Sequence, residues 1–203
     1  MTLQNWNSKD WKVDFPDIYF AGEIKNAPVI MKIGHVTEYI LRDIIPDAMK
    51  ALQNGGELSS LVLCLALVDY MAGFFVGKVA GEKAYVDFMR RYFPPKYHPF
   101  LQSIYGQLRC GLLHNLVFYN PNYKGERIKY TISGVAHNHL EEIEEDHVIF
   151  SIPIFIEDTR RAYIMYSYDI VMKTIDNPEL IENFNHRYNK LDGMSSIMLK
   201  TPD

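Results

Sequence analysis

Residues 58–76 form an almost continuously apolar stretch that is long enough to cross a lipid bilayer. Asp69 lies near the middle of this stretch, however, and a carboxylate there costs about 2.5–3.5 kcal/mol on membrane-insertion scales. A helix that is apolar on every side is also what a core requires when other helices surround it. We therefore expect residues 58–77 to form the central helix of a protein that makes no membrane contact.

The spacing of apolar residues predicts further helices on both sides of this one. The first runs from about residue 29 or 32 to residue 53, where Asn54, Gly55 and Gly56 are a strong stop signal. Pro46 should kink or divide this helix, because proline lacks the backbone N–H that a helix needs. The other predicted helices span residues 82–92, 99–115, 154–175 and 178–191.

The pattern changes between the helix at 99–115 and the two C-terminal helices. Residues 127–133 and 147–152 alternate apolar and polar side chains, which predicts two strands. The acidic run 141–146 between them is expected to lie on a solvated turn, so that the strands form a hairpin. The predicted fold class is mainly α, an antiparallel helical bundle with a small β-hairpin insertion.

A chain of 203 residues suits one domain with a full core. We expect an irregular N-terminal extension over residues 1–28 and a tail over 193–203. Between them, residues 29–192 should form a single helical domain with the β insertion at about 116–153. The formal net charge is −4, so no overall positive field attracts nucleic acid, and any RNA contact must be local.

The chain has two cysteines, Cys64 and Cys110, and both fall inside predicted helices without metal-ligand spacing. A reduced, cytoplasmic protein is the simplest interpretation. His137 and His139 lie close to the acidic run, but the spacing specifies no third metal ligand. The sequence also lacks a glycine-rich phosphate loop, and we therefore expect neither a metal nor a cofactor.

The most informative motif is the hexapeptide from Arg109 to His114, which places a guanidinium and an imidazole five residues apart in a predicted helix. Burying either group without a partner is costly, and the same holds for Asp69 in its apolar helix. We expect Asp69 to contact Arg109 or His114 from a neighbouring helix. The contact has two interpretations, a structural pair that fixes helix register or a site for phosphodiester chemistry.

Basic and aromatic residues precede this motif at the end of one helix and in the following loop. Mixed cations and rings of this kind can hold phosphates and stack bases, although a solvated loop has the same composition. Tyr105 lies four residues before Arg109 and should share its helical face. The candidate substrate-binding residues are Arg90, Arg91, Lys96, Tyr105 and Asn115.

The motif resembles that of the HEPN superfamily of helical domains, whose ribonuclease members carry an Arg, four to six residues and then a His near the end of a late helix. The preceding helix, with Asp69 among apolar residues, is similar to the buried second helix of that family. The resemblance covers about residues 32–115, with the helix at 154–175 as a further match. Active members often have a polar residue directly after the Arg, where this chain has Cys110.

The resemblance implies a homodimer with two motif copies facing one cleft, and metal-independent RNA cleavage that leaves a cyclic phosphate. His114 would act as general base or general acid, Arg109 would stabilise charge on the phosphate, and Asp69 would orient one of them. These three are the candidate catalytic residues of an endoribonuclease or toxin-type effector directed at RNA. The alternative is a non-catalytic helical binding or assembly module, in which the same network is structural or binds a nucleotide or a partner protein.

Overall fold

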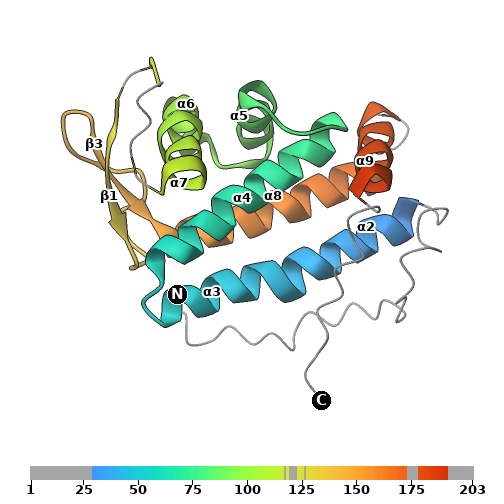
Figure 1. Ribbon diagram of the computed structural model, residues 1–203, viewed down its shortest axis with the longest axis horizontal. Coiled ribbons are helices and arrows are strands. Elements are labelled where there is room, and N and C mark those ends of the chain that lie inside the picture. The colour runs from blue at the N-terminus through green and yellow to red at the C-terminus, as the bar shows by residue number, and fades with distance from the viewer. Residues whose placement is uncertain (1–28, 117, 119–122, 126, 173–177, 192–203) are drawn as a thin grey trace.

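The computed structural model describes residues 29–116, 118, 123–125, 127–172 and 178–191 (Figure 1). Most of these residues are helical, and a small three-stranded sheet lies at one end of the helices. The prediction of a mainly helical fold with a small β insertion is therefore confirmed. The extension predicted for 1–28 and the tail predicted for 193–203 lie outside the described residues.

Helix α4 (Glu57–Val76) forms the centre of the core, as its apolar sequence predicts. Helices α3, α5, α8 and α9 all pack against it, so no single face of α4 needs to be polar. Among the described residues, α4 alone is long and apolar enough to cross a membrane. Its burial under four other helices is the arrangement that a core helix requires.

The first predicted helix is a continuous helical segment made of α2 (Val29–Glu38), η3 (Tyr39–Ile44) and α3 (Ile45–Gln53). The middle part, η3, is a π-helix in which the backbone N–H of Ile45 donates to the carbonyl of Ile40, one residue further back than in an α-helix. Pro46 follows directly and has no N–H to donate. The wider turn thus accommodates the proline, and Pro46 does not end the helix.

The sheet has strand order β1-β3-β2, with β1 (Lys129–Ser133), β2 (Glu142–Glu144) and β3 (His147–Ser151). The two predicted strands, β1 and β3, pair in parallel and therefore do not form the expected hairpin. The antiparallel neighbour of β3 is β2, which lies within the acidic run predicted as a turn. All three side chains of β2 are exposed, so the acidic residues stay solvated although their backbone pairs.

Helix α5 (Glu82–Tyr92) and helix α9 (Pro178–Leu191) have the predicted bounds, and α8 (Ile152–Met172) begins two residues earlier than predicted. Helices α3 and α4 are joined by a short turn and run antiparallel (Figure 1). Helix α8 runs in the same direction as α4, because both start at the end of the molecule that holds the sheet (Figure 1). The bundle is therefore antiparallel only in part.

The predicted helix at 99–115 is composite. It consists of the 3-10 helix η4 (Pro95–Phe100), α6 (Leu101–Ser103), the π-helix η5 (Ile104–Arg109) and α7 (Cys110–Asn115). Gly106 lies in the π segment, where a Cβ would be 2.2 Å from Cδ2 of Tyr123. The absence of a side chain at Gly106 therefore lets the Tyr123 ring lie directly on this helix.

Candidate functional site

Arg109 and Asp69 form a two-pronged ion pair between η5 and α4. Nε of Arg109 donates to Oδ1 of Asp69 at 3.2 Å, and Nη2 donates to Oδ2 at 3.0 Å. The side chains are 13% and 22% exposed respectively, so water screens the pair only in part. The expected contact between Asp69 and the motif is present, and it joins the apolar core helix to the motif helix.

His114 contacts the same guanidinium from the end of α7. Its Nε2 lies 3.0 Å from Nη1 of Arg109. Because a guanidinium only donates, Nε2 is the acceptor and the imidazole proton of the neutral ring is on Nδ1. The His114 side chain is exposed, whereas the Arg109 side chain is mostly covered. In an ideal α-helix, positions 109 and 114 are about 140° apart around the helix axis. The long Arg109 side chain bridges this separation.

The guanidinium of Arg109 packs on an aromatic ring. Its Cζ lies 5.4 Å from the ring centroid of Tyr105, one turn earlier in the π segment. The Tyr105 ring in turn lies 5.2 Å from that of Tyr85 on α5. Nη1 of Arg109 also lies 3.7 Å from the sulfur of Cys110. Tyr105 thus lies beside Arg109, as the spacing predicts, and the face of its ring contacts the guanidinium.

Electrostatics keep the centre of this network charged. Burial lowers the pKa of the Arg109 guanidinium, but the hydrogen bonds and negative charge of Asp69 outweigh burial and raise that pKa above its ordinary value. Arg109 is consequently a fixed cation at every physiological pH. An imidazole nitrogen that accepts a hydrogen bond from a fixed cation can take a proton from a substrate while the cation neutralises an anion.

Tyr85 belongs to this site, but no pattern in the sequence identifies it as a site residue. Its side chain is fully buried, and among the described residues its hydroxyl has no hydrogen-bond partner. Burial and then the negative charge of Asp69 raise the pKa of Tyr85 well above its ordinary value. In sequence it is one apolar-face residue of α5 among several, so only the packing of α5 on the motif identifies it.

The residues of the predicted basic cluster form ion pairs with carboxylates outside the motif. Arg90 pairs with Asp87 at 3.4 Å, Arg91 with Asp169 at 2.9 Å, and Lys96 with Asp158 at 3.4 Å. None of these three carboxylates belongs to the motif; two of them are on α8, which the sequence could not place beside α5. The other candidate, Asn115, is exposed at the end of α7 next to His114.

His139 has a structural role in the sheet region. Its Nδ1 accepts a hydrogen bond from the backbone N–H of Ser151 at 2.9 Å, and its ring packs on Tyr97 and Phe150. Burial, and secondarily the charge of Lys96, lower the pKa of His139 to about 3. Among the described residues no three His, Cys, Asp or Glu side chains are close enough together to hold a metal ion.

Comparison of the chain with protein-family models, with curated proteins and with solved structures finds no match in any of the three. The resemblance to the HEPN superfamily therefore rests on the motif and on the helix that pairs with it.

Proposed function

We propose that this protein is an HEPN-like, metal-independent endoribonuclease, a toxin-type effector that acts on RNA in the cytoplasm. One observation carries the proposal: the exposed His114 imidazole accepts a hydrogen bond from a guanidinium that a half-buried carboxylate holds in place. Cleavage of RNA through its own 2′-hydroxyl needs a base for that hydroxyl and a cation for the phosphate. His114 and Arg109 supply these two groups within hydrogen-bond distance of each other.

The hydrogen bonds to Asp69 determine which nitrogen of the Arg109 guanidinium can bind a phosphate. Nε and Nη2 each donate to a carboxylate oxygen of Asp69, so Nη1 is the guanidinium nitrogen that faces His114. A phosphate oxygen arriving at the site would compete with His114 for Nη1, because an anionic acceptor forms the stronger hydrogen bond with a guanidinium. Binding of the phosphate would thereby release Nε2 of His114.

The released Nε2 would take the proton of the ribose 2′-hydroxyl. The 2′-oxygen then forms a bond to phosphorus while the bond from phosphorus to the 5′-oxygen breaks, and a proton passes to that leaving oxygen. The products are a 2′,3′-cyclic phosphate and a 5′-hydroxyl, with no water consumed. Arg109 would stabilise the additional negative charge on the phosphate during the transfer.

We propose a homodimer as the active form, with the two copies of the motif facing one cleft. One His114 would then act as the base and the other as the acid on the leaving oxygen. The position of His114 at the exposed end of α7 supports this arrangement, because a second copy and a substrate can both reach it.

Cleavage of end-labelled tRNA and mRNA in excess EDTA tests the proposal. Wild type should give discrete products, and His114→Ala and Arg109→Ala should each lose them. His186→Ala is a matched control, because His186 is an exposed histidine on α9 outside the motif and should leave cleavage unchanged. Absence of cleavage by folded wild-type protein at micromolar concentration would overturn the proposal.

A second function is favoured by the burial of Arg109. Its side chain is mostly covered and donates twice to Asp69, which is the arrangement of a structural pair that fixes two helices. Under this alternative the protein is a non-catalytic module that binds a partner protein, and Cys110 after the Arg agrees with it. The same assay separates the two, because a module leaves RNA intact whether or not His114 is present.

A further inference from the structure

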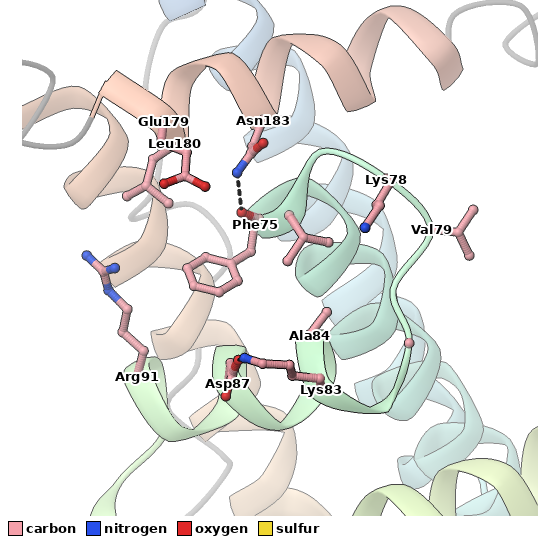
Figure 2. A pocket seen from close by; sticks show the side chains of 12 residues that line it. Phe75, Lys78, Val79, Lys83, Ala84, Asp87, Arg91, Glu179, Leu180 and Asn183 are labelled. Atoms are coloured by element: carbon pink, nitrogen blue, oxygen red, sulfur yellow. Dashed lines mark hydrogen bonds and ion pairs between the residues drawn. The ribbon is translucent and has the colours of Figure 1, made fainter.

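A cavity of about 560 Å³ lies far along α4 from the sheet, where the end of α4, one side of α5 and the start of α9 meet (Figure 2). Its volume is within the range of sites for small molecules. The cavity exists because α9 docks closely on the end of α4. Gly77 ends α4 with φ +72°, and a Cβ there would lie 2.7 Å from Oδ1 of Asn183 on α9. The side-chain amide of Asn183 donates to the carbonyl of Phe75 at 3.1 Å, which fixes α9 in this position.

The centre of the cavity is aromatic. Phe75 is half-buried, and its ring projects between α5 and α9 (Figure 2). Beneath it, the rings of Phe88 and Tyr166 pack edge-to-face at 6.0 and 6.4 Å, so its orientation is fixed. The guanidinium carbon of Arg91 lies 5.9 Å from the Phe75 centroid. A flat ring that enters here meets an aromatic surface and a planar cation, and both favour stacking.

Most charges around the cavity are already neutralised. Lys83 forms an ion pair with Asp87 along α5, and Arg91 forms one with Asp169. Lys78 and Glu179 differ, since neither has an ion pair with any described residue. They lie on opposite sides of Phe75 in Figure 2. The cavity therefore offers one cation and one carboxylate acceptor, with an aromatic ring between them.

We propose that this cavity binds a nucleoside monophosphate whose base carries an exocyclic amino group. The base stacks on Phe75 beside the Arg91 guanidinium, the amino group donates to the Glu179 carboxylate, and the phosphate pairs with the Lys78 ammonium. A carboxylate that accepts from an amino group distinguishes adenine from hypoxanthine, which has a carbonyl oxygen at that position. The proposal does not depend on RNA cleavage, because neither Arg109 nor His114 lines the cavity.

Isothermal titration calorimetry on the full chain tests this proposal with four probes: adenosine monophosphate, inosine monophosphate, adenosine and inorganic phosphate. We expect adenosine monophosphate to bind about tenfold more tightly than adenosine, because the phosphate adds a charge-assisted hydrogen bond. Inosine monophosphate should also bind about tenfold more weakly than adenosine monophosphate. Inorganic phosphate alone should give no detectable heat.

Two variants assign the contacts. Lys78→Ala should weaken binding of adenosine monophosphate about tenfold and leave adenosine unchanged. Glu179→Gln should remove the preference for adenosine monophosphate over inosine monophosphate. Both side chains are exposed, so both variants should fold. Lys50→Ala, which removes an exposed lysine of α3 outside the cavity, should bind like wild type, and so should His114→Ala.

Either of two results would overturn the proposal. One is absence of binding of adenosine monophosphate to the folded wild-type protein at millimolar concentration. The other is binding that Lys78→Ala and Lys50→Ala weaken equally, since a general loss of positive charge would then explain it.

Discussion

Arg109 donates to both carboxylate oxygens of Asp69 across 40 positions of the chain, and this pair joins the core helix α4 to the π segment η5. The same guanidinium reaches Nε2 of His114 at 3.0 Å. A single side chain thus connects the most apolar segment of the protein with the exposed His114. The Arg109 guanidinium therefore contributes both to the stability of the fold and to the proposed chemistry. Substitutions of its separate partners distinguish the two contributions.

Asp69→Asn should lower the free energy of unfolding by about 1–3 kcal/mol, because the half-buried Arg109 charge loses its partner. Urea denaturation measures the change. Asp87→Asn is a matched control, since Asp87 accepts from Lys83 and Arg90 in exposed ion pairs and should cost about 0.5 kcal/mol or less. Equal losses in the two variants would show that the Asp69 pair does not stabilise the fold more than a surface pair.

Tyr105 should support Arg109 through its ring face and not through its hydroxyl. Tyr105→Phe keeps the ring under the guanidinium and should leave the free energy of unfolding within about 1 kcal/mol of wild type. Tyr105→Leu stays apolar but is smaller and has no π system, and it should be less stable than Tyr105→Phe by about 1 kcal/mol or more. Urea denaturation of both variants checks this order, and a leucine variant as stable as the phenylalanine variant would refute it.

The helices and their stop signals could be predicted from sequence because they depend on local rules. The run of apolar residues in α4, the glycines after α3 and the prolines after α5 each act within a few residues. The Asp69 contact was predictable for a related reason. A carboxylate inside an apolar helix requires a partner, and the predicted motif helix carries a fixed cation that would be equally costly to bury alone.

Interactions between distant segments could not be predicted in this way. The parallel pairing of β1 with β3 depends on how the segment between them crosses the sheet, while alternation of side chains gives only the strands. Arg91 and Lys96 have the composition of a nucleic-acid site, but α8 supplies carboxylates to both. The cavity beside Phe75 depends on where α9 docks, and no local pattern encodes that position.

Gly77→Ser should destabilise the protein by about 1–3 kcal/mol. The residue has φ +72°, and an added Cβ would contact Asn183 at 2.7 Å. Gly81→Ser is the matched control, because Gly81 has φ −110° at the N-cap of α5 and open space around its Cα. Serine is a good N-cap residue, so this variant should be as stable as wild type or slightly more stable. Similar urea midpoints for the two variants would contradict the close docking of α9 on α4.

His139 should make the stability depend on pH. Its pKa in the folded protein is lowered from 6.5 to about 3, so as the pH falls below 6.5 the unfolded chain takes up a proton that the folded chain does not. The contribution of the neutral His139 to the free energy of unfolding is therefore fully present above pH 6.5. It is lost as the pH falls from 6.5 toward 3, by about 1.4 kcal/mol per pH unit.

The free energy of unfolding at pH 7, 6 and 5 checks this dependence. His139→Asn keeps a hydrogen-bond acceptor for Ser151 but does not titrate, and its stability should fall less steeply below pH 6.5 than that of wild type. Parallel pH profiles for wild type and His139→Asn would exclude His139 as the cause.

Arg109→Lys should abolish most RNA cleavage although it keeps the positive charge. A lysine cannot donate to both oxygens of Asp69 and also reach the phosphate, because the fork of the guanidinium is lost. We expect a rate at least about 100-fold lower in single-turnover cleavage assays. A rate within a factor of a few of wild type would show that charge alone suffices at this position.

The proposed reaction is cleavage through the ribose 2′-hydroxyl without a metal. The most direct test incubates wild-type protein in excess EDTA with an RNA and with the same RNA methylated on every 2′-oxygen. We expect products ending in 2′,3′-cyclic phosphate from the unmodified RNA and no products from the methylated RNA. Equal cleavage of both RNAs, or cleavage of neither by the folded protein, would contradict it.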